Sequence, residues 1–177
     1  MTRALIRSQQ RGGHFAILSS SPCDTAVQRD MTKLKKMKNK VESVATILGR
    51  ERESIIKEWL RQVNTVSELT RIPLTAADRT RHLPKLFDDL IYRLRHAKDS
   101  HRPISAAAAT HGQMRREQGY SAAMLVEESR VFEVSTFGTL RLHQSELDQN
   151  QVLADIAVIA DEVDAQLTEA VRSLTGT

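Results

Sequence analysis

The spacing of apolar residues predicts helices along most of the chain after residue 40. Between residues 41 and 63, apolar side chains recur every three or four positions on one face, and charged side chains occupy the other faces. This pattern predicts an amphipathic helix over residues 41–63, followed by a loop over residues 64–75. Trp59 is expected to anchor the packing of that helix, because large aromatic side chains dominate protein cores. The apolar face consists of Val41, Val44, Leu48, Ile55, Trp59 and Val63.

Start signals mark the next helices. Thr75 precedes Ala-Ala-Asp78, a sequence able to cap a helix that begins near Ala76. Pro84 lacks an amide hydrogen, so it either kinks this helix or opens a new one that continues to about residue 97. Ser105 is placed to cap a helix over residues 106–118. Alanines favour that helix, and its small residues would let another helix approach closely.

The apolar stretch over residues 122–142 predicts a central helix that is buried nearly all round. Projected at about 100° per residue, its apolar side chains fall on most of the circumference. One side carries Met124, Leu125, Val131, Phe132 and Leu142, and much of the rest carries Val126, Val134, Phe137 and Leu140. Gly119 can end the preceding helix in the left-handed conformation, and Ser121 can cap this one. Two helices are therefore expected to meet at Gly119-Tyr120-Ser121.

A last amphipathic helix is expected over residues 151–174, capped by Asp148 or Asn150. Its apolar stripe is regular and wide, with Asp164 as an interruption. A stripe of this kind predicts a symmetric homodimer, built mainly from this helix together with the central one. The candidate dimer surface consists of Leu153, Ile156, Ala160, Val163, Leu167 and Val171.

These elements predict an all-α protein, in which a disordered basic tail over residues 1–40 precedes a single bundle of five or six helices over residues 41–177. The low aromatic content of 4% and the 7 glycines favour helices over a turn-rich sheet. A single cysteine, Cys23, excludes an internal disulfide. The apolar runs in the tail are too short for a signal peptide or a membrane span, so we expect a cytoplasmic protein.

The positive charge of the chain is concentrated in the tail. Residues 1–40 hold 9 Lys or Arg and 2 Asp or Glu, which leaves 17 basic and 20 acidic residues from residue 41 onward. The helical part is therefore slightly acidic, and nucleic acid is not its expected partner. A solvated tail is the main interpretation. The alternatives are a basic patch that binds nucleic acid or an anionic membrane, and translation that begins at Met31 or Met37.

Glu128 is the unusual residue of the central helix, because it falls in the middle of an apolar side and needs a partner there. Arg115 and His111, one turn apart on the preceding helix, are the expected partners. A metal site at His111 and Glu128 would need one or two further ligands that the sequence does not nominate, so no metal and no cofactor are predicted. Haem held by His111 is the alternative. No catalytic or nucleotide-binding motif is present, so an enzyme is not expected.

The residues around this helix corner resemble the N-terminal domain of the RsbR/RsbRD family of RsbT co-antagonists, a domain also found in front of bacterial sensor histidine kinases. The resemblance covers roughly residues 41–174. It implies a non-catalytic, all-helical sensory input domain, often dimeric. We expect it to act by changes of helix packing in the dimer. Because the family's output modules are missing from the sequence, the chain either acts in trans on a kinase or an anti-sigma pathway protein, or is a truncated remnant. The residues that carry it are His111-Gly112, Arg115, Gly119-Tyr120-Ser121, Glu128, Trp59 and Leu83-Pro84.

Overall fold

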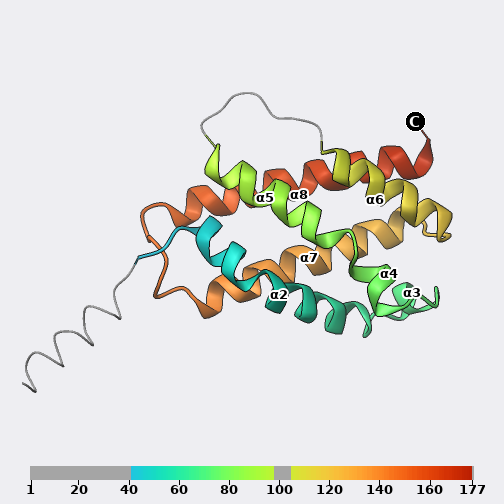
Figure 1. Ribbon diagram of the computed structural model, residues 1–177, viewed down its shortest axis with the longest axis horizontal. Helices are drawn as coiled ribbons and strands as arrows, with labels where there is room; N and C mark the ends of the chain where they lie inside the picture. The colour runs from blue at the N-terminus through green and yellow to red at the C-terminus, as the bar shows by residue number, and fades with distance from the viewer. Residues whose placement is uncertain (1–40, 98–104, 177) are drawn as a thin grey trace, which may run out of the picture. The chain divides into compact units, whose positions relative to one another are not determined.

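The computed structural model describes residues 41–97 and 105–176 (Figure 1). The expected tail over residues 1–40 and most of the turn before Ser105 lie outside this range. Within it, five helices of 12 to 24 residues and two short helices make up the fold, without a strand, which confirms an all-α bundle. The helices are α2 (Val44–Val63), α3 (Ser67–Thr70), α4 (Ala76–Thr80), α5 (Leu83–Arg95), α6 (Ala106–Glu117), α7 (Ala122–Leu142) and α8 (Val152–Thr175).

Side-chain caps set the starts of several helices. The hydroxyl oxygens of Ser43, Thr75, Ser105 and Ser121 each accept a hydrogen bond from the backbone amide three residues later. The caps expected at Thr75, Ser105 and Ser121 are therefore confirmed. Helix α2 begins at Val44, later than the expected residue 41, because Ser43 occupies the capping position.

Two of the expected boundaries were wrong. Ser67–Thr70 forms the short helix α3 inside the segment expected to be a loop. The residue before α8 is Gln151, whose side chain makes no capping bond, and not Asp148 or Asn150. Asp148 instead accepts a hydrogen bond from the amide of Asn150, and this bond closes a turn ahead of the helix. Pro84 opens a new helix and does not kink the preceding one, because it lies in the first turn of α5.

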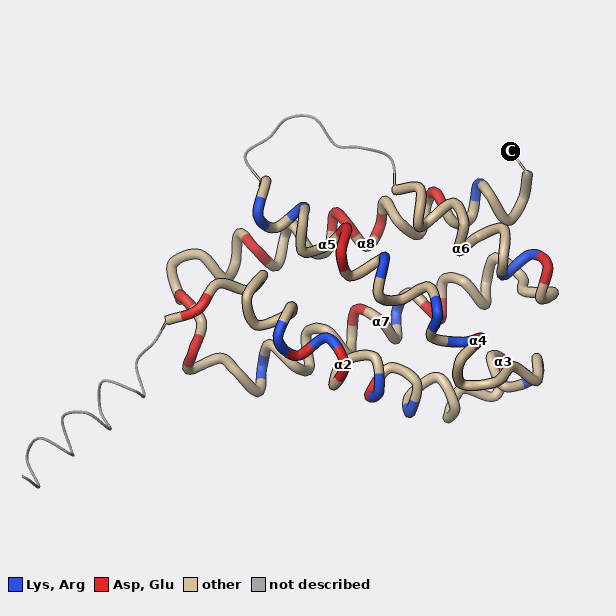
Figure 2. Tube along the Cα trace, viewed as in Figure 1, with Lys and Arg blue, Asp and Glu red and all other residues tan. Residues whose placement is uncertain are grey.

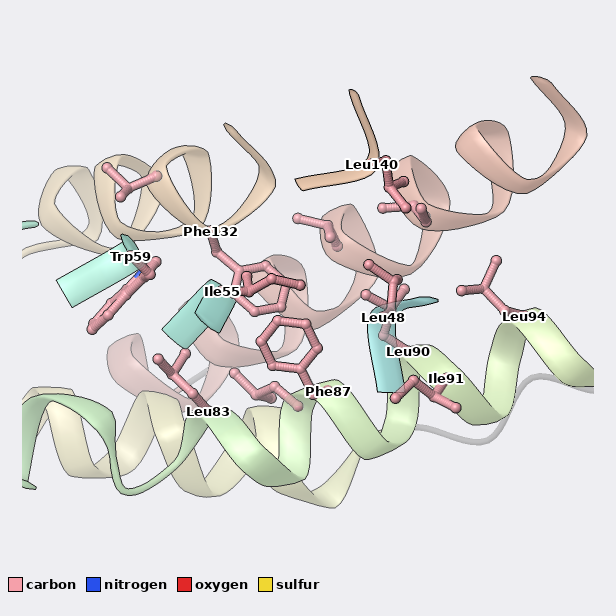
Figure 3. Packing of buried hydrophobic residues seen from close by; sticks show 14 of the residues in the cluster. Leu48, Ile55, Trp59, Leu83, Phe87, Leu90, Ile91, Leu94, Phe132 and Leu140 are labelled. Atoms are coloured by element: carbon pink, nitrogen blue, oxygen red, sulfur yellow. The ribbon is translucent and has the colours of Figure 1, made fainter. Parts of the chain in front are cut away.

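Helix α7 lies between α2 and α8 and contacts both (Figure 1). Helix α5 contacts both α2 and α8, and α6 packs along α8. Figure 3 shows the core between these helices, where the rings of Phe87 and Phe132 meet with their centroids 4.8 Å apart. Ile55 of α2 reaches the same place. Side chains from residues 55, 87 and 132 therefore share one continuous core.

Helices α6 and α8 approach each other closely at Gly112. A Cβ atom built on Gly112 would lie 2.0 Å from the carbonyl oxygen of Ala170, which is far inside van der Waals contact. The close approach expected of the small residues in this helix is confirmed. It takes place at Gly112, where only a hydrogen atom fits between the two backbones.

Helix α7 is not buried all round, contrary to the expectation. Val126 is 51% exposed, Val134 is 44% exposed, and Leu142 near the end of the helix is exposed as well. The reason is the arrangement of the bundle, since α2 and α8 are the main partners of α7 and cover only part of its circumference. A strip of α7 that carries two valines is left facing solvent.

The buried face of α8 also differs from the predicted apolar stripe. Leu153 is 76% exposed, whereas polar residues of the same helix are buried. The amide of Gln166 donates to the backbone oxygen of Leu86 at 3.2 Å and to the carboxylate of Glu162 at 2.9 Å, so the buried polar groups have partners. The buried residues are Asp155, Ile159, Glu162, Val163, Gln166 and Ala170.

Within the described residues, no helix combines the length and the apolar composition that crossing a bilayer requires.

Candidate functional site

A group of buried polar residues lies where α4 and α6 end and where α5 and α7 begin. We call it the polar cluster. Each member has little exposed surface, and together they come from segments spread over fifty residues of sequence. Its members are Arg79, His82, His111, Arg115, Tyr120 and Glu128.

Arg115 and Glu128 form the centre of the polar cluster. The Nε atom of Arg115 donates to Glu128 Oε2 at 2.9 Å, and its second terminal nitrogen donates to Oε1 at 2.6 Å. Arg115 is completely buried and Glu128 is 3% exposed. A guanidinium that holds both oxygens of a carboxylate is the strongest form of ion pair available to these side chains. The pairing predicted for Glu128 is therefore present, and His111 Nε2 lies 3.4 Å from the same carboxylate.

The remaining donors of Arg115 are also used. One terminal nitrogen donates to the side-chain oxygen of Gln118 at 2.7 Å, and the other donates to the backbone oxygen of Arg79 at 3.0 Å. Its guanidinium carbon lies 4.7 Å from the centroid of the Tyr120 ring, a cation–π distance. Arg115 therefore ties the ends of α4 and α6 to the start of α7.

Arg79 is a second buried arginine of the cluster. It donates to the Tyr120 hydroxyl at 3.1 Å, and to the backbone oxygens of Leu69 and Ile72 at 3.1 and 2.7 Å. The Tyr120 hydroxyl in turn lies 3.4 Å from Glu128 Oε1, within hydrogen-bond distance. Arg79 thus connects the irregular segment around α3 to the same corner.

The helix corner has the predicted geometry. Gly119 has φ of 82°, in the left-handed region that glycine adopts without strain, and the amide of Tyr120 donates to the carbonyl of Arg115 at 2.9 Å. Ser121 then caps α7. Trp59 of α2 is fully buried, as expected, and its indole nitrogen donates to the backbone oxygen of Glu128 at 3.3 Å. The anchor of α2 is therefore fastened to the residue at the centre of the cluster.

Two histidines lie beside the ion pair. The rings of His82 and His111 stack with their centroids 3.9 Å apart and their planes 14° apart, and Trp59 meets His82 edge-on at 6.2 Å. The Nδ1 atom of each imidazole is buried and has no hydrogen-bond partner. Burial, together with the nearby His111 and Arg115, holds the pKa of His82 well below its usual value. His82 is therefore neutral at neutral pH.

The ionised form of Glu128 is favoured despite its burial. Burial by itself would raise the pKa of this carboxyl, but the hydrogen bond from His111 and the charge of Arg115 outweigh it and lower the pKa. Burial and the Glu128 charge have the opposite effect on Tyr120, whose pKa they raise. At neutral pH the cluster therefore contains a carboxylate, a neutral phenol and at least one neutral imidazole.

A small cavity adjoins the polar cluster. Its volume is about 40 Å³, and Trp59, His82, His111 and Glu128 lie in its wall together with apolar side chains of α5, α7 and α8. Pockets for organic ligands begin at about 300 Å³, so this cavity is on the scale of a water molecule or a small ion. A wider groove of about 610 Å³ runs between the starts of α5 and α6, and His82 lines it as well. His82 therefore stands between the groove and the cavity.

The candidate dimer residues of α8 differ in how deeply they are buried. Leu153 is exposed; Ile156, Ala160, Leu167 and Val171 are half-buried; Val163 is buried in the core of its own chain. Leu167 also lines the small cavity. Val163 is therefore not available to a second chain, because α8 turns it toward the core.

Two members of the cluster were missed from the sequence. Arg79 lies in a short polar helix whose pattern predicts solvent exposure, and the loop carbonyls that bind it are visible only in the fold. His82 precedes Leu83-Pro84, and a residue just before a helix start gives no signal of which way its ring will turn. The available hint was its position two residues before Pro84, where the helical pattern of the sequence is interrupted.

Comparison with known protein families, with curated proteins and with solved structures finds no match to this chain.

Proposed function

We propose that this chain is a non-catalytic regulatory input domain of bacterial signal transduction, acting in the cytoplasm as a homodimer on a protein partner in trans. One observation carries the proposal. A fully satisfied buried ion pair, Arg115 with Glu128, occupies the place where five helical segments meet.

The energetics of such a pair support a regulatory role. Replacing a buried ion pair with well-packed apolar residues often leaves the stability of a protein unchanged or raises it. Stability alone therefore does not account for a buried pair such as Arg115–Glu128. Its directional bonds do specify one arrangement of α4, α6 and α7. If those bonds rearrange, the helix corner at Gly119 changes its angle, and Trp59 transmits the change to α2. Packed helices shift between discrete arrangements, which makes this corner suited to a two-state response.

Exposed apolar side chains on α7 and α8 support the dimer. Val126 and Val134 lie two turns apart on α7, and Leu153 near the start of α8 is among the most exposed large apolar residues described. The tail on which the nucleic-acid alternative depends lies outside the described residues. Along the described helices, acidic and basic residues are interspersed, as α2 shows in Figure 2, which does not favour a phosphate-binding face.

The regulatory role can be tested by fusing the full chain ahead of a dimeric histidine-kinase core and measuring autophosphorylation. The double variant Arg115→Met with Glu128→Leu should change the kinase rate several-fold, because it removes the bonds that set the helix corner. A matched control is Arg130→Met with Glu127→Leu, since both of its residues lie on α7 beside Glu128 but closer to solvent. Equal rates for the two double variants, with both proteins folded, would contradict the proposal.

The dimer can be tested by light scattering. We expect a mass of about twice 19.9 kDa for the full chain. Leu153→Glu should yield monomers, because it places a charge in an apolar contact. Ala154→Glu is the matched control, since residue 154 is exposed but lies about 100° around the helix from residue 153. A monomer at high micromolar concentration would rule out the dimer.

A further inference from the structure

We propose that His82, His111 and Glu128 form a binding site for one late first-row divalent metal ion, of the Zn²⁺ class. This inference is independent of the proposed function. The side chains come from the turn before α5, from α6 and from α7. Two imidazoles and one carboxylate make up a ligand set that suits Zn²⁺ and its neighbours and is typical of sites that keep an open coordination position.

The distances among the three groups suit a single ion. One ligand atom from each residue lies within 4.8 Å of the others, and His111 Nε2 is 3.4 Å from Glu128 Oε2. Two ligands at about 2.1 Å from Zn²⁺ in a tetrahedron stand about 3.4 Å apart, which matches the second distance. His82 is stacked on His111 with the ring planes 14° apart, so its ring must turn out of the stack to bring a nitrogen to the same ion.

The chemistry of these groups suits a metal ion. A metal takes up neutral imidazole and ionised carboxylate. Arg115 already holds the Glu128 side chain as a carboxylate through two hydrogen bonds. The Nδ1 atom of His82 is buried without a partner, an arrangement that is costly unless a further group binds it.

Arg115 restrains the carboxylate without using all of it. Each carboxylate oxygen has two lone pairs, and the Arg115 fork occupies one on each oxygen. The remaining lone pair of Oε2 faces His111 Nε2 at 3.4 Å, so an ion held between these two atoms would take the place of the His111 proton. Ligating carboxylates are commonly held by such outer hydrogen bonds, which orient them. The positive charge of Arg115 opposes the ion at the same time, so we expect weaker binding than at a structural zinc site.

The structure also has room for a fourth ligand and a route of entry. The cavity of about 40 Å³ adjoins all three residues and is large enough for a water molecule. His82 lines both this cavity and the groove between α5 and α6. An ion arriving from the groove therefore meets His82 first and reaches the other two ligands behind it.

The test is titration of the full chain, stripped of metal with EDTA and desalted, with ZnCl₂ in a calorimeter. We expect one ion per chain. His82→Phe preserves the ring stack on His111 but removes the ligand, so it should weaken binding by about tenfold or more. The matched control is His143→Gln, because His143 also contacts carboxylates, those of Glu51 and Glu146, at the protein surface. This control should bind like the unmodified chain.

A second measurement needs no variant. Trp59 is the single tryptophan of the chain, and its ring centroid lies 6.2 Å from that of His82. One equivalent of Cu²⁺ at the cluster should quench its fluorescence. His143 lies 15 residues along α7 from Glu128, about 22 Å at 1.5 Å per residue, so Cu²⁺ bound there should quench far less.

Three outcomes would overturn the site. They are no zinc binding at high micromolar concentration, loss of binding in His143→Gln with retention in His82→Phe, and tryptophan fluorescence unchanged by one equivalent of Cu²⁺. If His82→Phe does not fold, the Cu²⁺ titration of the unmodified chain decides the question. Saturation of quenching at one equivalent then supports the site, and unchanged fluorescence refutes it.

Discussion

Removing either partner of the Arg115–Glu128 pair should strongly destabilise the fold, whereas removing both should cost little more than one. Arg115→Met leaves a buried carboxylate that has lost both bonds from its guanidinium partner, at 2.6 and 2.9 Å. Glu128→Leu leaves a completely buried cation with only neutral acceptors. Breaking a buried pair in this way costs about 3–5 kcal/mol.

The double variant replaces the pair with two apolar side chains of similar length. The uncompensated charge is then absent, although Gln118 and the Arg79 carbonyl still lose a donor. The two single costs would sum to about 6–10 kcal/mol. We expect the double variant to lose about 3–5 kcal/mol, because the buried acceptors that Arg115 satisfied are left without a donor. The coupling free energy is the difference between these two values, about 3–5 kcal/mol. This lies at or above the upper end of the coupling free energies measured for residue pairs.

The assay is urea denaturation of the four proteins followed by circular dichroism, in buffer with EDTA. The pH supplies a second readout. In the unmodified chain, the stability that the lowered Glu128 pKa contributes is present above the pKa of an unfolded glutamate and is lost as the pH falls through the folded pKa. In Arg115→Met, burial should raise the pKa of Glu128, so acid should stabilise this variant relative to the unmodified chain.

Two results would refute this reasoning. If the single costs add to within about 0.5 kcal/mol, the two side chains do not interact. If each single variant costs less than about 1 kcal/mol, the pair behaves as an exposed one. The pair Arg130 with Glu127 provides the comparison, because it has similar bond lengths and lies on the surface of α7, the helix that carries Glu128.

Three further predictions follow from the fold. Gly112→Ala should destabilise the protein by about 1–3 kcal/mol, since its Cβ atom would meet the backbone of Ala170. Gly138→Ala, where no atom lies within 4 Å, should instead stabilise it by about 0.5–1 kcal/mol, and equal shifts in thermal unfolding would contradict the close approach. In metal-free protein, stability should fall as the pH drops below about 6.5, by up to about 1.4 kcal/mol per pH unit, because the unfolded chain protonates His82 and the folded chain does not. His82→Phe should flatten this slope in urea denaturation, and an unchanged slope would exclude His82 as its source. A truncated chain that begins at Lys40 should unfold at the same temperature as the full chain, because residues 1–40 lack apolar periodicity. A loss of several degrees would show that the tail packs on the bundle.

Local signals in the sequence were sufficient for the five long helices and for one contact between them. Caps at Thr75, Ser105 and Ser121 act within three residues, so their chemistry can be predicted without the fold. Gly119 supplies the left-handed corner for the same reason. The pairing of Arg115 with Glu128 was also predictable, because the corner between them is short and a carboxylate on an apolar face needs a partner.

Contacts between distant segments were decided only by the tertiary structure. The stacking of His82 on His111, and the bonds of Arg79 to loop carbonyls, depend on how α4, α5 and α6 meet. On α8, polar Gln166 is buried and apolar Leu153 is exposed, and the apolar pattern of that helix predicts neither. A helical projection reports which side chains share a face. The direction in which that face turns depends on the shape of the neighbouring helices, here on the close approach of α6 at Gly112, and no periodicity within α8 itself contains that information.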